Sequence, residues 1–261
     1  MNEDVTRLRR IWDMCAPTAT IILMFVIWQV LVGVFHVRQV ILPAPSAILE
    51  ALAAQPGWFM QEGLYTMLTM LIGFGLAVVV GIVLAILIVE VKLLENTLYV
   101  LIAALNSVPK VAIAPLFVIW LGTGYGPKIA IAFLIAFFPI VIDSVLGLKS
   151  VSKEMLDLAS SMRAGQLAQF WRIRLPTALP SIFAGMKVGI SLALVGTIVG
   201  EFVASDHGLG YIILTAQGTF ETAQIFAANI LLGAAGIVLF WGMTLLERRC
   251  VPWHASQRRE M

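Results

Sequence analysis

The chain has 261 residues, of which 60% are hydrophobic and only 12% are charged. Soluble domains are about 45–50% apolar and about 25% charged, so this composition excludes an ordinary soluble fold and indicates that lipid is the solvent. The formal net charge of +2 is too small to indicate nucleic-acid binding. Cys15 and Cys250 lie near opposite ends without metal-ligand spacing, which indicates neither a zinc site nor a disulfide framework.

The first predicted element is an apolar run, Ala16–Phe35, that follows three arginines. It is longer than the core of a signal peptide and no small-residue cleavage site follows it, so we interpret it as a retained first span. The next stretch, "LPAPSAILEALAA", predicts a short amphipathic helix on the outer face that begins at Pro45-Ser46, with Ser46 as N-cap. The alternative is an irregular loop.

Five further apolar stretches are long enough to cross the hydrocarbon, which takes about 20 residues. They are Leu64–Val89, Thr97–Leu121, Ile129–Leu148, Ser181–Ala204 and Ile225–Leu246. One of these stretches, Thr97–Leu121, is interrupted by polar residues and prolines, namely Asn106, Pro109, Lys110 and Pro115. Such a break is tolerated only where protein or a water-filled cavity covers the freed backbone.

The basic residues predict the orientation of these six spans. If the N-terminus is cytoplasmic, thirteen of the 17 basic residues lie on the inside. They are Arg7, Arg9, Arg10, Lys92, Lys149, Lys153, Arg163, Arg172, Arg174, Arg248, Arg249, Arg258 and Arg259. Only Arg38 and Lys128 lie outside, while Lys110 and Lys187 fall within spans. The positive-inside rule therefore places both termini in the cytoplasm.

A polar segment before the fifth span, residues 153–176, is longer than a turn requires. Its apolar side chains Met155, Leu158, Ala159 and Met162 share one helical face. Gly165 can end that helix, and a second short apolar face follows it at Leu167, Phe170 and Trp171. We therefore expect two short helices on the cytoplasmic surface, each with a face to bury against another protein.

This segment resembles the cytoplasmic loop of ABC importer permeases, which carries E-A-A, three residues, G, nine residues, then I-x-L-P. Asp157-Leu158-Ala159 takes the first three places and Arg163 the glycine place. Ile173-Arg174-Leu175-Pro176 completes the motif at the expected spacing. Further stretches resemble the branch that imports sulfonates, taurine, nitrate and pyrimidine precursors, among them "NSVPKVAIAPLFVIWLGTG", "FFPIVIDSVLGLKSV" and "GLGYII".

Three positions depart from the family pattern. Asp157 replaces glutamate and is followed by Leu158, and Arg163 stands where the family has the glycine that makes the turn. We expect the turn to shift two residues on, to Ala164-Gly165, which would alter the docking geometry or indicate an unusual ATPase partner.

The resemblance implies a type I ABC importer permease fold in a multi-pass protein of the bacterial inner membrane. It also implies a second copy of the chain, two ATPase subunits and an external solute-binding protein as partners. The chain has no G-x-x-x-x-G-K-[ST] sequence, so ATP and Mg would be bound by the partner ATPase and no cofactor by this chain. The glycine-rich stretch Gly122–Lys128 has the wrong spacing for a phosphate loop and is interpreted as an outer turn.

Ionisable residues at membrane depth are candidates for function. Lys187 and Asp143 lie at similar depths and could form an ion pair that braces spans four and five; alternatively, Lys187 snorkels and Asp143 faces water. Lys110, beside Asn106 and Pro109, is either a pore-facing cation that attracts an anionic solute or a lysine that points to a headgroup layer. Glu201 is interpreted as an interface residue or a support of the outer gate.

Small residues line one face of the fifth span within an arc of about 80°. They are Gly185, Gly189, Ala193, Gly196 and Gly200. Such a seam lets helices approach closely, and the alternative is that it lines the solute path.

The sequence thus predicts an all-α permease with six spans that takes up a small, anionic solute by alternating access as a homodimer. Its organisation is an N-terminal span with an outer-face amphipathic helix over residues 1–63, a permease core over 64–246 with a cytoplasmic coupling segment at 150–177, and a cytoplasmic tail over 247–261. A secondary transporter driven by an ion gradient is the main alternative, but we find no inverted repeat and few intramembrane acids. A membrane enzyme is disfavoured because no catalytic constellation gathers at one depth.

Overall fold

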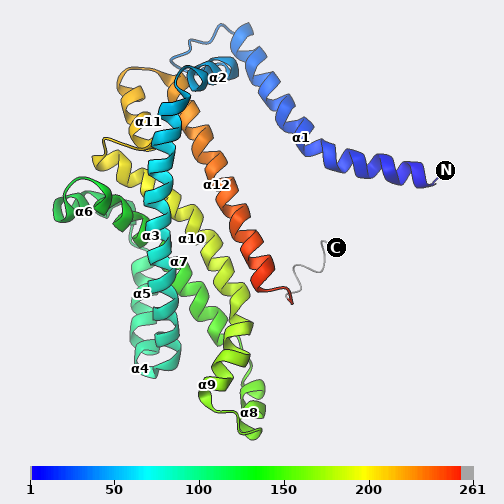
Figure 1. Cartoon of the computed structure of the whole chain (residues 1–261), viewed down its shortest axis with the longest axis vertical. Helices are drawn as coiled ribbons and strands as arrows, with labels where there is room; N and C mark the ends of the chain where they lie inside the picture. Colours follow the sequence, from blue (N-terminus) through cyan, green and yellow to red (C-terminus); the bar gives the residue numbers. More distant parts are fainter. Residues whose placement is uncertain (1, 254–261) are drawn as a thin grey trace. The chain divides into compact units, whose positions relative to one another are not determined.

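The computed structural model describes residues 2–253, with the side chains of Ala16 and of residues 19–253. All regular elements in this range are helical, and Figure 1 shows their order along the chain. The chain forms two compact units: Met1–Met60 with Ile212–Ile230, and Gln61–Tyr211 with Leu231–Met261. The chain passes between the units within three helices, α3, α11 and α12.

The first unit holds two N-terminal helices, α1 (Asn2–Val34) and α2 (Pro45–Ala54). The predicted amphipathic helix therefore exists, but Ser46 is not its N-cap as we expected. Ala44 takes that place and Pro45 is the first helical residue, where its fixed φ suits the helix. Ser46 instead forms two hydrogen bonds with Gln29 of α1. The Gln29 amide oxygen accepts the Ser46 N–H at 3.1 Å, and the Gln29 NH₂ donates to Ser46 Oγ at 3.2 Å.

Two later helices enter the same unit, α11 (Leu209–Gly218) and the start of α12 (Thr222–Cys250). The ring of Phe226 in α12 lies 5.7 Å from that of Trp28 in α1, and the Thr222 hydroxyl donates to the Val40 carbonyl at 2.7 Å. α11 was missed by the sequence analysis because a helix of ten residues is too short to stand out as a span.

The core of the second unit is formed by three long helices, α3 (Pro56–Glu90), α7 (Tyr125–Lys149) and α10 (Leu175–Ala204). α7 lies between the other two. On one side, a Cβ at Gly73 of α3 would stand 2.7 Å from Ala132 Cβ, and on the other a Cβ at Gly196 of α10 would stand 2.9 Å from Ala132 Cα. Glycine is required at these crossings because backbone meets backbone.

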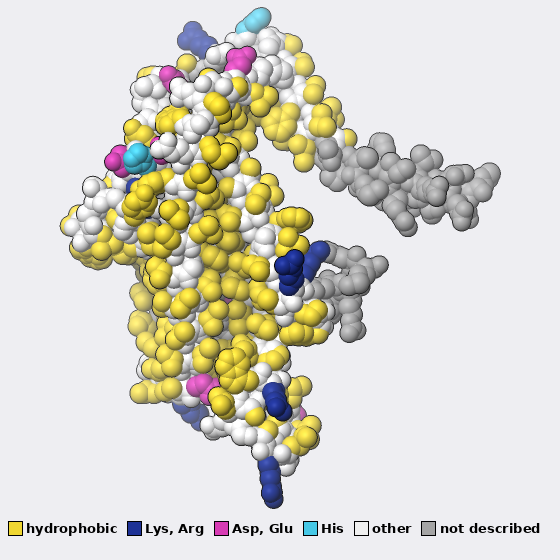
Figure 2. Space-filling view, in the orientation of Figure 1, with side chains coloured by type: hydrophobic (Ala, Val, Ile, Leu, Met, Phe, Trp, Pro, Cys, Tyr) yellow, Lys and Arg dark blue, Asp and Glu magenta, His cyan; other side chains and the backbone are white. Residues whose placement is uncertain are grey.

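Four helices among the described residues are long and apolar enough to cross a membrane: Pro56–Glu90, Tyr125–Lys149, Gln166–Ala204 and Thr222–Cys250. They contain four of the six predicted spans. Figure 2 shows hydrophobic side chains over most of the visible face of α3 and α12, as contact with lipid requires. The apolar part of α1, Ala19–Val34, belongs to the shorter class of 10–17 residues, so the first span stays a prediction.

The third predicted span is broken, as its polar residues and prolines indicated. Two helical pieces, Lys92–Asn106 and Lys110–Leu121, meet at an angle of 88°. They comprise α4 (Lys92–Leu94), η1 (Glu95–Tyr99), α5 (Val100–Asn106), η2 (Lys110–Ile113) and α6 (Ala114–Leu121). Counted as one span, the pair raises the number of candidate spans to five.

Candidate functional site

The polar segment before α10 begins with α8 (Lys153–Ser161). Ser152 caps this helix, since its hydroxyl accepts the Met155 N–H at 3.4 Å. The burial of α8 differs in part from the single apolar face expected from the sequence: Ala159 is buried, whereas Leu158 is exposed, as is Asp157. Met155, Leu158 and Met162 are 50%, 63% and 76% exposed, and apolar side chains this open on a polar segment indicate a contact surface for another protein.

The end of α8 corrects the expected shift of the turn. Arg163 itself adopts the left-handed conformation, with φ of 60°, whereas Gly165 has an ordinary φ of −66° and precedes the next helix as its N-cap. The Arg163 N–H donates to the Ser160 carbonyl at 2.9 Å and the Ala164 N–H to the Ala159 carbonyl at 3.0 Å. These two bonds are the Schellman pattern that a C′ glycine usually supports, so the turn stays at Arg163.

The next two short helices, α9 (Gln166–Gln169) and η3 (Phe170–Arg174), run without interruption into α10. The second of the two expected surface helices is thus the start of a 39-residue helix, Gln166–Ala204, that continues into span five. Gln169 ties it to α8, because its NH₂ donates to Ser160 Oγ at 3.1 Å and to the Ala164 carbonyl at 2.9 Å.

The Ile-x-Leu-Pro end of the motif lies at the junction with the membrane core. Ile173, Leu175 and Pro176 are half-buried. Between them, Arg174 pairs with Glu90 at the end of α3 at 3.1 Å. A groove of about 640 Å³ adjoins this pair and is lined mainly by apolar side chains of α3, α9 and η3.

In the broken span, Lys110 Nζ donates to the carbonyl and to the side-chain oxygen of Asn106, both at 2.8 Å. It also lies 4.6 Å from the ring centroid of Phe138 in α7. The lysine therefore occupies the acceptors that the break after Asn106 frees, and Pro109, which has no N–H to lose, forms the corner. Lys110 is half-buried, which keeps both interpretations from the sequence open.

Lys187 and Asp143 do not form the ion pair that the sequence suggested. Lys187 Nζ instead pairs with Glu247 Oε2 of α12, and both side chains are largely buried, at 21% and 15% exposed. Asp143 lies against Gly185, where a Cβ would come within 2.8 Å of Asp143 Cβ. The sequence analysis missed Glu247 because it fell in the tail, beyond the predicted end of the last span.

The seam of small residues on α10 faces α7. A Cβ at Gly185, Gly189 or Gly200 would stand within 3.0 Å of α7 atoms, as at Gly196, and Ala193 is fully buried. Backbone and stiff side chains fill the space that such a Cβ would need. In this structure the seam is a helix contact with no opening along it.

A buried polar cluster joins α3, α10 and the start of α11, and the sequence analysis found only one of its members. Glu201 of α10 is fully buried; its Oε1 accepts the Thr66 hydroxyl at 2.8 Å and its Oε2 accepts the Gly210 N–H at 2.7 Å. Thr66 Oγ1 accepts the Leu209 N–H at 2.8 Å. Glu62, one helical turn before Thr66, accepts the Gly208 N–H at 2.5 Å.

Three consecutive amides at the start of α11 are thus held by three side chains, Glu62, Thr66 and Glu201. We name this set the α11 clamp. The first N–H groups of a helix lack partners within the helix and attract negative charge, which is why two carboxylates converge there. Gly208 is required for the approach, because its φ is 107° and a Cβ would overlap the Glu201 carboxylate. The sequence signals were the "GLG" triplet and the four-residue spacing of Glu62 and Thr66.

Lys128, expected in an outer turn, is fully buried beside the α11 clamp. Its Nζ donates to the Tyr65 hydroxyl at 2.8 Å. Its backbone approaches α10 so closely that a Cβ at Gly200 would stand 2.9 Å from Lys128 Cα. The expectation was wrong because the glycine turn ends sooner: Gly122 and Gly124 take positive φ, and α7 already starts at Tyr125. The buried cation offsets the charge of nearby Glu201 and Glu62.

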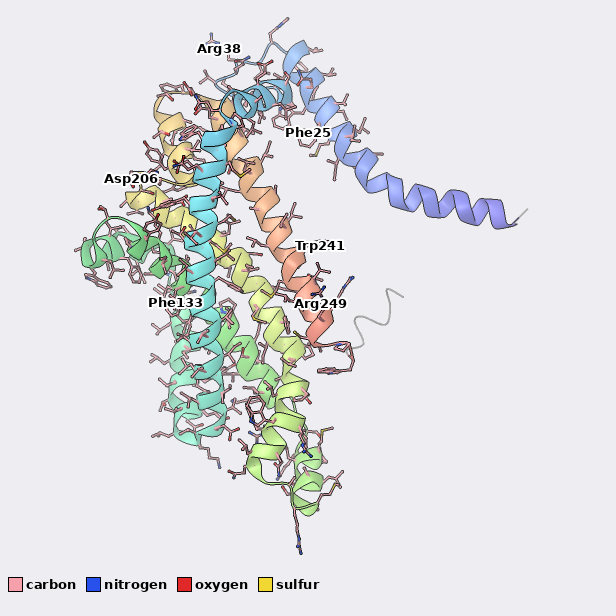
Figure 3. All side chains as sticks on the ribbon, in the orientation of Figure 1. Phe25, Arg38, Phe133, Asp206, Trp241 and Arg249 are labelled. Atoms are coloured by element: carbon pink, nitrogen blue, oxygen red, sulfur yellow. The ribbon has the colours of Figure 1, made fainter. Side chains whose placement is uncertain are left out.

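The rim of this cluster reaches the surface. His207 Nδ1 lies 3.3 Å from Glu62 Oε1, and the His207 side chain is 50% exposed whereas that of Glu62 is 5% exposed. Figure 3 labels its neighbour Asp206 in the loop that leads into α11. No group of three or more His, Cys, Asp or Glu residues in the described part of the chain is arranged to hold a metal ion.

Comparison with known proteins agrees with this architecture. Residues 77–251 match the family described as binding-protein-dependent transport system inner membrane component. The chain is 30% identical over 251 residues to the formylaminopyrimidine transport permease protein ThiX of Halalkalibacterium halodurans, covering 96% of this chain and 100% of the relative. It is 35% identical over 247 residues to the riboflavin transport system permease protein RibX of Chloroflexus aurantiacus, covering 94% and 92%.

Two other comparisons concern a further permease sequence and a solved structure. The taurine transport system permease protein TauC of Escherichia coli is 28% identical, covering 91% of this chain and 89% of the relative. A solved structure of the MetNI methionine ABC transporter in an inward-facing conformation has a chain with a TM-score of 0.61 at 17% identity, covering 75% of this chain and 95% of that one. The fold is that of type I ABC importer permeases, and the relatives are transport subunits rather than enzymes. The chain belongs to the inner-membrane component family of binding-protein-dependent transport systems.

Proposed function

We propose that two copies of this permease form the membrane path of an ATP-driven importer, with two ATPase subunits and an external solute-binding protein as partners. The observation that carries the proposal is the open apolar face of α8, formed by Met155, Leu158 and Met162. This face lies in the segment whose spacing resembles the ATPase-docking loop of the family. The chain itself would bind no cofactor, and ATP and Mg would be held by the ATPases.

The proposed topology has six spans with both termini in the cytoplasm of a bacterium, in the inner membrane. The uneven distribution of basic residues supports it. The broken pair supplies one of these spans and α1 another. Within this topology, residues 1–63 form the N-terminal span and an amphipathic helix on the outer face, 64–246 the permease core with its coupling segment at 150–177, and 247–261 a cytoplasmic tail. Cys15 and the side chains of Arg7, Arg9 and Arg10 lie outside the described side chains, and Arg258 and Arg259 lie outside the described residues.

Coupling would run from α8 into the membrane through a rigid connection. When ATP brings the two ATPases together, α8 moves with the subunit on which it is docked. Gln169 transmits that motion to α9, which is continuous with α10. The pair between Arg174 and Glu90 passes it to α3. Alternating access follows if the two long helices shift as one body.

The proposed solute is a small anion or carries an anionic group, in keeping with the relatives named for the transport of nitrate and of taurine, whose sulfonate is anionic. Lys110 is the cation that supports this choice, because it lies at the break of a bent span with Asn106 and Pro109. Lys187 is less suited to the role, since Glu247 neutralises it. No relative supports the alternative of an ion-gradient transporter.

The test uses proteoliposomes that contain the permease, its ATPase and its binding protein, with labelled taurine as the first probe. A Leu158→Asp variant should lose co-purification of the ATPase and ATP-dependent uptake, because a charge replaces an apolar contact. Glu154→Gln, on the opposite face of α8, is the matched control and should keep both. Normal ATP-driven accumulation by a chain with residues 157–165 scrambled would contradict the proposal, as would uptake driven by a proton gradient without ATP.

A further inference from the structure

A helical membrane core can be built without buried polar groups such as those of the α11 clamp. Two carboxylates and a hydroxyl are buried near the start of α3 and the end of α10, where apolar side chains would cost less to bury. They accept hydrogen bonds from three consecutive backbone amides, those of Gly208, Leu209 and Gly210. Each of the three side chains accepts one of these amide N–H groups, so none of the three amides is left without a partner.

The location of the clamp also sets it apart. Glu62 lies two residues after the point in α3 where the chain passes from the first unit to the second, between Met60 and Gln61. Gly210 lies a similar distance before the passage in α11, between Tyr211 and Ile212. Two of the three passages between the units are therefore tied to each other by the clamp bonds, together with the contact of the Tyr65 and His207 rings at 5.4 Å.

Water reaches the rim of the α11 clamp, whereas Thr66, Glu201 and the three amides are buried. The His207 ring beside Glu62 is 50% exposed, and Asp206 is exposed next to it. When polar groups separate into water, amides and carboxylates regain hydrogen bonds, whereas separated apolar surfaces do not. A contact made of carboxylates and amides can therefore open towards water and close again at a modest difference in free energy.

We propose that the α11 clamp is a latch of the transport cycle: Glu62, Thr66 and Glu201 hold the N-terminal turn of α11 in the resting state, and this turn is released when ATP is bound. The inference rests on the proposed function, because it assigns the clamp to a step of ATP-driven transport. The three side chains are positioning residues that act through α11 and need not touch the solute. Lys128 stays with α7 and keeps the two carboxylates compensated when the amides leave.

The direct test measures hydrogen exchange of the amides of residues 208–210 in the assembled permease–ATPase complex in lipid. In the resting complex these amides should be protected, and trapping the complex with ATP and vanadate should speed their exchange by about tenfold or more. A peptide from the α7–α10 contact, which has no part in the latch, should show no change. Equal protection in both states would overturn the latch.

The second test separates a latch from a static brace. Thr66→Val removes the bonds to Leu209 and Glu201 at nearly constant volume. For a latch, ATP hydrolysis without any binding protein should rise several-fold, because the resting state is less favoured. Thr66→Ser should restore the low rate.

Thr69→Val is the matched control, because Thr69 is equally buried in α3 but donates only to carbonyls of its own helix. It should behave as wild type. A brace would instead lower hydrolysis in Thr66→Val in proportion to the amount of assembled complex, and that result would overturn the inference. If wild type itself shows no ATPase binding and no ATP-driven uptake, the proposed function fails; if wild type transports and Thr66→Val is unchanged, only the latch fails.

Discussion

At the scale of single residues, backbone conformation decides more than side-chain type. Arg163 takes a left-handed φ because the Schellman bonds at the end of α8 require it, although arginine lacks the freedom of glycine. The sequence revealed the departure from the family motif but suggested the wrong remedy, since Gly165 offered an alternative turn. Local hydrogen bonds, which cannot be read from spacing, decided between them.

Arg163→Gly should therefore stabilise the end of α8. Left-handed conformation costs a residue with Cβ about 1 kcal/mol, so the amides of residues 163 and 164 should exchange about fivefold more slowly in the variant. Arg163→Val should exchange faster, because a β-branched residue tolerates this region least. Hydrogen exchange of the peptide that covers 160–165 measures both, and unchanged exchange in both variants would contradict the strain argument.

Gly208 and Gly210 provide a second prediction at this scale. Gly208→Ala places a Cβ in the Glu201 carboxylate, and Gly210→Ala places one 2.8 Å from Glu201 Cβ. Each should lower the yield of folded permease and its Tm in detergent. Gly218→Ala is the control within the same helix, since nothing lies within 4 Å of a Cβ there. Equal Tm values for all three would show that the clamp accommodates a methyl group.

At the scale of elements, hydrophobic length and small-residue spacing predicted most of the helices. Four long spans and the break after Asn106 follow from composition alone. Helix pairing could be predicted in part from the sequence. The seam from Gly185 to Gly200 indicated a close neighbour, and the structure identifies that neighbour as α7. Glu247 could not be identified because it lies just beyond a predicted span end, where a charged residue has an ordinary explanation, and Glu62 was missed for the same reason although its spacing from Thr66 is a sequence signal.

The seam yields a prediction for the pairing of α7 and α10. Gly189→Leu or Gly196→Leu should reduce the folded yield severely, because the added side chain meets the Ile140 side chain of α7 at Gly189 and the backbone of Ile131 and Ala132 at Gly196. Gly233→Leu in α12, where a Cβ has nothing within 4 Å, serves as control and should fold normally. If the α10 variants gave wild-type yield and uptake, the seam would not be required for the packing of α7 against α10.

The contact between α10 and α12 depends on a charge pair. Lys187→Met leaves Glu247 buried without its partner and should cost about 3 kcal/mol, whereas the double variant Lys187→Met with Glu247→Gln should recover much of that loss. Tm values of the two single variants and the double variant form the cycle. Additive losses would show that the two side chains do not interact.

At the scale of the whole molecule, the orientation in the membrane rests on charge distribution. In a chain with Cys15→Ser, exposed Cys250 should react with a membrane-impermeant maleimide in inverted vesicles but not in intact spheroplasts. A variant with Arg38→Cys and both native cysteines replaced by serine should show the opposite pattern. Labelling of Cys250 from outside would reverse the proposed topology.

The donors that the α11 clamp binds are main-chain amides, which every amino acid except proline supplies. The exposed residues just before the clamped turn, Asp206 and His207, can therefore change their side chains without loss of these bonds. A permease built this way can exchange one delivery protein for another over evolution by altering what the loop displays, while the fastening underneath is inherited intact.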